Sequence, residues 1–156
     1  YLAAADRGGD ITFHGPGQIV AYPIVDLKAR EMDLHRYMRD LENVAIDLLE
    51  ERGISASGKD GYTGVWSGEE KIASIGIAAS DWVTYHGIAV NVNVDLGFFD
   101  MIYPCGMRRG KMTSMEGLLG RPQDIGGVKR ALTRHLADEF NIRKADIVED
   151  QYAGVA

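Results

Sequence analysis

Hydrophobic side chains recur at helical spacing in two stretches of the chain, and each stretch predicts an amphipathic helix. The first follows Asp33, a good N-cap, and ends before Gly53, a natural terminator. Its apolar positions are Leu34, Tyr37, Met38, Leu41, Val44, Ala45, Leu48 and Leu49. The second runs from about Ile125 to Phe140, with Val128, Leu132, Leu136 and Phe140 inward.

Elsewhere the pattern changes to alternation or to short apolar runs, which predict strands. These runs are 18–27, where Pro23 indicates an edge or a bulge, 64–66 and 71–79 around a hairpin turn at 67–70, and 82–96 after a turn at 80–81. In the last run, Ile88, Val90, Val92 and Val94 share one face, and Ala89, Asn91 and Asn93 share the other, as in a half-buried strand. The predicted class is α+β, with a mixed, mostly antiparallel sheet flanked by helices.

Composition narrows the class of protein. The chain has 156 residues, enough for one domain spanning 1–156, and 46% hydrophobic with 26% charged residues is typical of a globular protein. A formal net charge of −6 argues against nonspecific nucleic-acid binding. We expect no membrane span and no signal peptide, and one cysteine with six methionines suits a reducing cytoplasm. The first residue is not methionine, so we expect a start inside a longer parent.

The single cysteine, Cys105, lies between Pro104 and Gly106. A lone cysteine forms no intrachain disulfide and is too few for a cysteine-based zinc site, which leaves a buried filler or a reactive thiol. Proline fixes the backbone before the sulfur, and glycine allows close approach after it. The apolar run 98–103 then predicts a thiol presented at the end of a strand, and residues 107–120 read as a loop or short helical turns.

A reactive thiol needs a nearby cation or base that lowers its pKa. The candidates are His14, His86, Lys71, Arg108, Arg109 and Lys111, whereas His35 and His135 lie on predicted helices as surface or core residues. Lys71 begins an apolar strand, so it is either an edge charge in water or a base desolvated beside a pocket. The sequence has no zinc-ligand spacing, Walker A, GxGxxG or GxSxG motif, and we expect no metal.

Five sequence blocks occur in a characteristic order between about Arg7 and Leu118: RGGDITFHGPGQ, GVWSGEEKIASIGI, YHGIAVNVNVDL, FFDMIYPCG and KMTSMEGL. Together they resemble the lipoyl(octanoyl) transferases, which are octanoyl-[acyl-carrier-protein]:protein N-octanoyltransferases. The resemblance implies a fold shared with biotin protein ligases and lipoate ligases. Family members usually carry a further N-terminal segment, so we expect a single catalytic domain that lacks it.

The resemblance also implies a reaction. Octanoyl-acyl carrier protein would be the donor, and a lysine on lipoyl domains of 2-oxoacid dehydrogenase complexes or on the glycine cleavage H protein the acceptor. Cys105 would form the acyl-thioester with Lys71 as its partner, and no cofactor is expected. The implied substrate-binding residues are Arg7, Gly8, Gly9, Asp10, Ile11, Thr12, Phe13, His14, Ser74, Ile75, Gly76, Gly87, Ile88 and Ala89, with His86 and Gly106 as possible additions.

Two alternatives remain open at this point. One is an ATP-dependent lipoate–protein ligase of the same fold, which activates a free acid as an adenylate and needs no cysteine. The other is an inactive module that binds acyl carrier or lipoyl domains. The Pro104-Cys105-Gly106 corner and the Arg-Gly-Gly start of the first block favour the transferase over the ligase.

Overall fold

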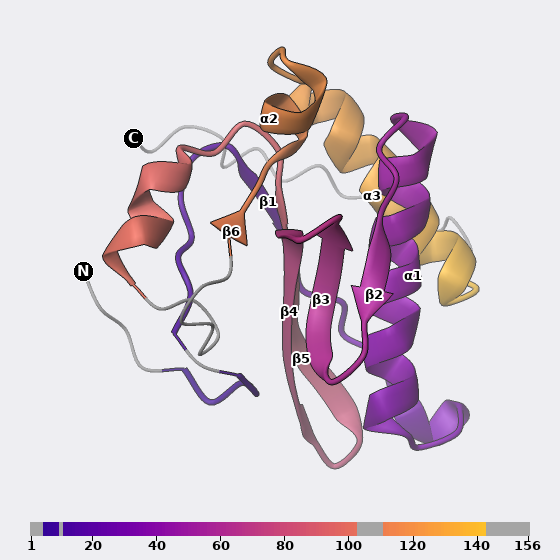
Figure 1. Cartoon of the computed structure of the whole chain (residues 1–156). Coiled ribbons are helices and arrows are strands. Elements are labelled where there is room, and N and C mark those ends of the chain that lie inside the picture. Colours follow the sequence, from indigo (N-terminus) through magenta and orange to yellow (C-terminus); the bar gives the residue numbers. More distant parts are fainter. Residues whose placement is uncertain (1–4, 10, 103–110, 143–156) are drawn as a thin grey trace, which may run out of the picture.

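A mixed, mostly antiparallel sheet forms the centre of the structure, a computed structural model that describes residues 5–9, 11–102 and 111–142 (Figure 1). Its strands are β1 (Gln18–Ala21), β2 (Ser57–Lys59), β3 (Tyr62–Ser67), β4 (Glu70–Ser80), β5 (Val83–Asn91) and β6 (Lys111–Met112). The antiparallel order is β1-β5-β4-β3-β2, and β6 pairs in parallel with β4 at Glu70 and Lys71. The predicted α+β class and its mixed sheet are confirmed.

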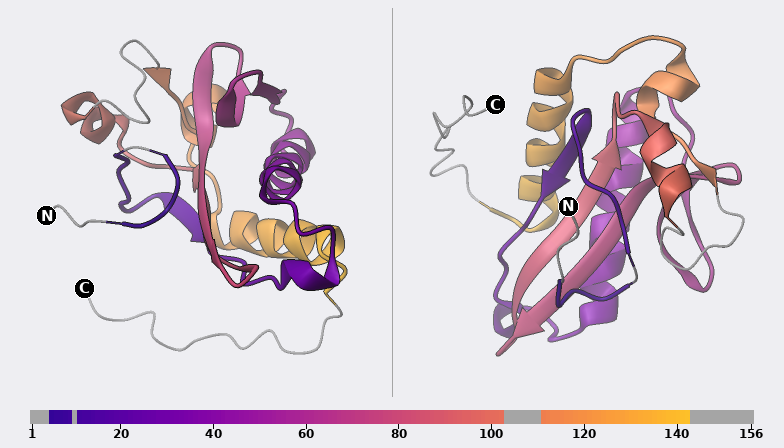
Figure 2. Two further views of the ribbon diagram at one scale, coloured as in Figure 1. Left: turned by 90° about the horizontal axis from the view of Figure 1, so that it is seen from below. Right: turned by 90° about the vertical axis from the view of Figure 1, so that its left-hand side faces the viewer.

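Helices cover one face of this sheet, and loops cover the other (Figures 1 and 2). The helices α1 (Leu34–Glu51) and α3 (Ile125–Glu139) pack on one face, and α2 (Met115–Leu119) follows β6. The N-terminal segment before β1 and the 3₁₀ helix η2 (Leu96–Met101) lie over the opposite face. A short 3₁₀ helix, η1 (Leu27–Ala29), precedes α1.

The two long helices form where the sequence predicts them. Asp33 caps α1, because its Oδ1 accepts hydrogen bonds from the amides of His35 and Arg36. Gly53, with φ of 78°, takes the left-handed conformation just after the helix. In α3, Val128 and Leu132 are buried in the core. Both helix predictions are therefore confirmed, including the apolar faces that pack on the sheet.

The long β4–β5 hairpin is the main support of the loop-covered face. Its turn consists of Asp81 and Trp82, which both have positive φ, at 50° and 67°. Such turns match the right-handed twist of the strands that they join. The register runs from Ser80↔Val83 at the turn to Ala73↔Val90 at the far end. The turn predicted at 67–70 is confirmed by the bounds of β3 and β4, and the turn predicted at 80–81 exists but lies one residue later, at 81–82.

Two strand predictions were too long. The strand predicted over 18–27 ends at Ala21, two residues before Pro23, although its edge position is confirmed. The strand predicted over 82–96 ends at Asn91, and it is not half-buried, because Ala89 and Asn91 on its second face are buried too. That face is covered from the side of β1 and of the segment after β6, where Asn91 bonds to Gln18 and to Thr113.

The apolar run that precedes the cysteine is helical rather than extended. Residues Leu96–Met101 form η2, capped by Asp95, whose Oδ1 accepts a hydrogen bond from the amide of Gly97. The expectation of a strand leading directly to the thiol is therefore wrong for these residues. Cys105 itself and its neighbour Gly106 lie outside the described residues. The stretch predicted as loop or short turns holds β6 and α2 in its described part.

Candidate functional site

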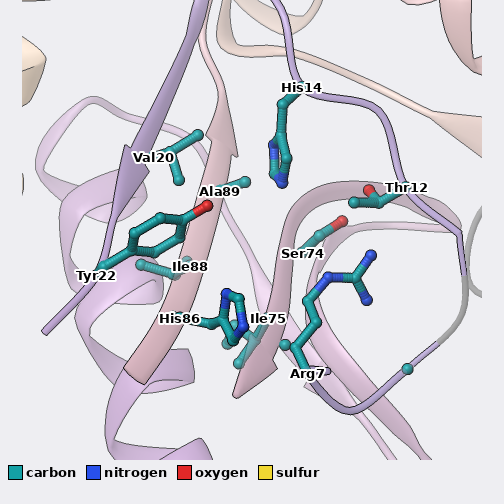
Figure 3. A pocket seen from close by; sticks show the side chains of 13 residues that line it. Arg7, Thr12, His14, Val20, Tyr22, Ser74, Ile75, His86, Ile88 and Ala89 are labelled. Atoms are coloured by element: carbon teal, nitrogen blue, oxygen red, sulfur yellow. The ribbon is translucent and has the colours of Figure 1, made fainter. Parts of the chain in front are cut away.

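A groove opens on the loop-covered face of the sheet, where three segments of the chain meet (Figure 3). The loop before β1, the strand β1 with the residue after it, and the β4–β5 hairpin each contribute. The lining residues are Arg7, Gly9, Thr12, His14, Val20, Tyr22, Ser74, Ile75, Gly76, His86, Gly87, Ile88 and Ala89. Mixed polar and apolar walls of this kind suit a ligand with an aliphatic body and a polar end.

Glycine at two positions of the hairpin allows the walls to approach the sheet closely. A Cβ at Gly76 would lie 2.8 Å from Cδ of Arg7 and 3.0 Å from the carbonyl oxygen of Gly8. At Gly87, the opposite residue on β5, a Cβ would collide with the carbonyl oxygen of Ala21. Both glycines therefore serve close approach of backbone, which any side chain would prevent.

Most of the residues predicted to bind substrate lie together in this groove. From the first block these are Arg7, Gly9, Thr12 and His14, and from the hairpin they are Ser74, Ile75, Gly76, Gly87, Ile88, Ala89 and the possible member His86. The position of a residue in the groove is a structural fact, whereas its contact with a substrate stays a prediction.

The remaining predicted residues have other surroundings. Gly8 donates its amide to the carbonyl oxygen of Ile77, at 2.8 Å, and so holds the N-terminal loop on β4. Phe13 stacks on Phe98, with ring centroids 4.8 Å apart, and meets Phe99 edge to face. It therefore fixes the loop to η2 rather than lining the groove. Ile11 is half-buried outside the lining set, and Asp10 lies outside the described residues.

Two residues that line the groove and one residue that supports its wall were not predicted from the sequence. Val20 and Tyr22 alternate along the edge strand and its continuation, so they face the same side, and their exposure at an edge is the signal that could have indicated them. Asp6 supports the wall from outside. Its two carboxylate oxygens accept hydrogen bonds from His86 Nε2 at 2.8 Å and from the hydroxyl of Tyr85 at 2.9 Å.

Hydrogen bonds to Asp6 also shift ionisation equilibria at this end of the groove. The His86 hydrogen bond, followed by that of Tyr85, lowers the pKa of the Asp6 carboxyl below its ordinary value. The hydrogen bond between Tyr85 and Asp6 also raises the pKa of the Tyr85 phenol, because only the neutral phenol can donate it. At neutral pH, Asp6 is therefore an ionised acceptor that holds both side chains.

Lys71 lies upstream of the groove on β4 and is only 2% exposed. Its Nζ donates to the carbonyl oxygen of Thr63 at 2.8 Å and lies 5.0 Å from the centroid of the Trp66 ring. The interpretation of Lys71 as an edge charge in water is therefore wrong. Gly64 makes room for it, because a Cβ there would lie 2.5 Å from Lys71 Cε.

A continuous chain of hydrogen bonds joins the groove to the backbone of Lys71. His14 Nδ1 lies 3.4 Å from Oε1 of Gln18, and Gln18 Nε2 donates to Oδ1 of Asn91 at 2.8 Å. Asn91 Nδ2 then donates to the carbonyl oxygen of Thr113 at 2.9 Å, and the amide of Thr113 donates to the carbonyl oxygen of Lys71, also at 2.9 Å. Its buried part, at Asn91 and Thr113, fixes the relative positions of the segments that these residues join.

Two structural findings concern metals and membranes. Among the described residues, no group of three or more His, Cys, Asp and Glu side chains is arranged to hold a metal ion. No helix in the described ranges combines the length and the apolar character needed to cross a membrane.

Known proteins with similar sequences carry a common name. An octanoyltransferase of Thermoanaerobacter sp. (strain X514) is 49% identical over 152 residues, which cover 97% of this chain and 66% of that protein. An octanoyltransferase of Geobacter metallireducens is 48% identical over 131 residues, covering 84% of this chain and 62% of that protein. A chloroplastic octanoyltransferase of Arabidopsis thaliana is 52% identical over 115 residues, or 73% of this chain and 41% of that protein. The chain thus spans less than two thirds of the length of these relatives.

Solved structures with similar folds have much lower sequence identity. Biotin protein ligase from Aquifex aeolicus superposes with a TM-score of 0.64 at 20% identity, covering 80% of this chain and 53% of that chain. A structure of a bi-partite lipoate protein ligase and its E2 lipoyl domain from Thermoplasma acidophilum contains a chain with a TM-score of 0.65 at 20% identity, covering 92% and 60%. These similarities concern the fold, and they confirm the predicted biotin and lipoate ligase architecture. A family model described as the lipoyl protein ligase A/B catalytic domain matches residues 1–137, which is most of the chain, and the chain therefore belongs to that family.

Proposed function

We propose that this protein transfers an octanoyl group from octanoyl-acyl carrier protein to a lysine of a lipoyl domain, as in lipoate biosynthesis. The observation that carries the proposal is the identity of 49% to a protein named octanoyltransferase, which extends over 97% of this chain. The acceptors would be lipoyl domains of 2-oxoacid dehydrogenase complexes and the glycine cleavage H protein. The expectations of a cytoplasmic location and of a single domain without its N-terminal segment stay predictions.

The proposed reaction has two steps that share one thiol. In the first, the Cys105 thiolate attacks the thioester carbonyl carbon, the bond to the phosphopantetheine sulfur breaks, and the leaving thiolate takes a proton from the Lys71 ammonium. In the second, the acceptor amine attacks the Cys105 thioester, a C–N bond forms and the C–S bond breaks. Neutral Lys71 accepts the proton that the amine loses, which restores the starting ion pair of thiolate and ammonium.

Two features of the structure support this chemistry. Lys71 is buried on β4, upstream of the groove, so that its amine is shielded from bulk water. The walls of the groove combine small residues, Ser74, Gly76 and Ala89, with larger ones such as Val20 and Tyr22. An aliphatic chain in such a groove gains about 0.8 kcal/mol for each methylene that it buries. Metal or nucleotide groups are not needed for a nearly thermoneutral exchange of thioesters.

Intact-mass spectrometry after incubation with octanoyl-acyl carrier protein tests the proposal. We expect a mass gain of one octanoyl group, mapped to Cys105 by peptide fragmentation and absent in Cys105→Ser. Lys71→Met should load about 10²- to 10⁴-fold more slowly, as expected for loss of a proton-transfer group. Lys28→Met is the matched control, because Lys28 is an exposed lysine that pairs with Asp81 outside the groove, and it should load at the wild-type rate.

The same experiment separates the two alternatives. A parallel incubation with free octanoate, ATP and a lipoyl domain should give no product if the protein is a transferase. Lipoyl-domain octanoylation in that tube, retained in Cys105→Ser, would refute the thioester route and indicate an ATP-dependent ligase. Absence of an adduct together with tight binding of the acyl carrier protein would instead indicate a binding module without activity.

A further inference from the structure

We infer that residues Asp6–Gly8, the strap, form the end wall of the groove and set the longest acyl chain that the protein accepts. The inference rests on the proposed function for the identity of the ligand, and it concerns a property that the function alone does not fix. The strap crosses the sheet at one level, opposite to Lys71, and hydrogen bonds hold it to both strands of the hairpin.

The strap crosses both strands of the hairpin at a single level. Ile77 and His86 are register partners on β4 and β5. Gly8 donates its amide to the carbonyl oxygen of Ile77 at 2.8 Å, and Asp6 accepts from His86 Nε2, also at 2.8 Å. The strap is therefore fastened to both strands at this level, with Arg7 between the two attachment points and its side chain on the groove wall.

The crossing lies at the end of the groove opposite to Lys71. Along β4 the chain passes from Lys71 through Ser74 to Ile77, and the register partners of Ser74 and Ile77 are Ala89 and His86. Figure 3 shows the same order in space, with His14 at one end of the groove, His86 and Arg7 at the other, and Ser74 between them. A chain whose carbonyl is held near Lys71 would point its methyl end at the strap.

The distance between these levels fits an eight-carbon chain. The Lys71 amine reaches the level of Ser74, because a Cβ at Gly64 would lie 3.1 Å from Lys71 Nζ, and Val65, the residue after Gly64, pairs with Ala73. Ser74 and Ile77 are three residues apart on β4, and a strand rises about 3.3 Å per residue, which gives about 10 Å. An extended octanoyl chain has seven C–C bonds of about 1.5 Å, each advancing about 1.3 Å, for a length of about 9 Å. Two further methylenes would add about 2.5 Å and would meet the strap.

The backbone of His86, beside the end wall, has an unusual conformation. His86 has φ of 60° inside a strand, a conformation that a non-glycine residue seldom adopts. Such conformations persist where the surrounding structure enforces them, and they cluster at ligand-binding sites. Here the His86 ring is held by Asp6 on one side and by an edge-to-face contact with Tyr22, at 5.8 Å, on another. Because Asp6 is ionised at neutral pH, this fastening is complete under assay conditions.

The test measures the chain-length profile of Cys105 loading with hexanoyl-, octanoyl-, decanoyl- and dodecanoyl-acyl carrier proteins. In Asp6→Ala the strap loses its two side-chain fastenings on β5, and we expect the ratio of decanoyl to octanoyl loading rates to rise about tenfold. Gly76→Ala should change the ratio by a different route, because its Cβ would displace Arg7 and Gly8. Asp6→Asn keeps an acceptor oxygen and should remain closer to wild type.

Asp81→Asn is the control. Asp81 and Asp6 are both exposed carboxylates, at 82% and 69%, and both pair with a nearby cation or imidazole. Asp81 lies in the turn of the same hairpin but outside the groove, so its substitution should leave the profile unchanged. An unchanged decanoyl to octanoyl ratio in both Asp6→Ala and Gly76→Ala would overturn the inference.

A binding measurement keeps this result separate from the proposed function. Hexanoate to dodecanoate are titrated against a fluorescent fatty acid bound to the wild-type protein and to Asp6→Ala. A longer optimum in Asp6→Ala supports the end wall even if wild-type Cys105 takes no octanoyl group, an outcome that would refute only the transferase mechanism. The same optimum in both proteins refutes the end wall whatever the loading experiment gives.

Discussion

Replacing Asn91 with alanine should destabilise the protein by about 2–4 kcal/mol. Asn91 is 2% exposed and joins three parts of the chain, since it accepts from Gln18 Nε2 at 2.8 Å and donates to the carbonyl oxygen of Thr113 at 2.9 Å. Thr113 is 4% exposed, so its carbonyl oxygen would lose its partner away from water, at a cost of about 1–3 kcal/mol. The lost bond to the half-buried Gln18 adds about 0.5–1.5 kcal/mol.

Urea denaturation followed by tryptophan fluorescence measures this loss. With an m value of about 2 kcal/mol per M, a loss of 3 kcal/mol lowers the transition midpoint by about 1.5 M at unchanged slope. A domain of ordinary stability, about 5–15 kcal/mol, survives the substitution and remains folded for the measurement. Asn91→Asp keeps the acceptor for Gln18 but presents a carboxylate to the Thr113 carbonyl, and it should be at least as destabilising.

The matched control is Asn43→Ala on the exposed face of α1. There alanine is the better helix former, and the change should stay within about 0.5 kcal/mol of wild type or stabilise slightly. A loss below about 1 kcal/mol for Asn91→Ala, with the slope unchanged, would refute the reasoning. It would mean that the Thr113 carbonyl oxygen finds another donor and that the polar chain between the groove and Lys71 does not contribute to the free energy of unfolding.

Two other substitutions test the surroundings of Lys71 and the helical layer. Gly64→Ala should destabilise the protein by about 1–3 kcal/mol and slow Cys105 loading, because its Cβ would occupy the space of Lys71 Cε. Gly58→Ala is the control, because a Cβ at Gly58 would make only an ordinary contact, and it should have neither effect. Urea denaturation and the rate of Cys105 loading are measured for both variants. Burial raises the pKa of Glu139, so this carboxylate opposes folding at pH 7 and ceases to do so once it is protonated in both states, below its unfolded pKa. Glu139→Gln should therefore raise the melting temperature at pH 7 and leave it unchanged near pH 4, and an equal shift at both pH values would contradict the burial argument.

Local signals were sufficient for the helices and turns but not for the ends of the strands. Asp33 and Gly53 mark the ends of α1 by interactions within a few residues, so the sequence contains them. The alternation after Asn91 continues through Val92 and Val94, which are buried although the strand has ended. The reason is a distant contact, because the amides of Val92 and Asn93 both donate to the carbonyl oxygen of Gly17 instead of continuing the ladder with β4. Hydropathy reports burial, and it does not distinguish a strand from a loop that is held against the core.

For the candidate site too, the sequence indicates local features but not the contacts between distant residues. Glycine-rich and small-residue segments of the first block and of the hairpin were recognisable from their composition, and most of them lie in one groove. The fastening of Asp6 to Tyr85 and His86 joins residues about 80 positions apart, and nothing in the local sequence around Asp6 indicates it. The pairing of Cys105 with Lys71 stays a prediction, since Cys105 lies outside the described residues.

The placement of Lys71 depends on a single extra residue in β4. Val65 pairs with Ala73, and both belong to the core under the helices. Strict alternation back from Ala73 would place Lys71 on that same face, yet Trp66 pairs with Lys71, so Ile72 is an added residue that forms a bulge. Trp66 follows Val65 and therefore faces away from the core, and cross-strand partners share a face. The bulge thus turns Lys71 out of the helical core to the face that carries the groove, which explains why neither hydropathy nor period alone could assign this lysine to the site.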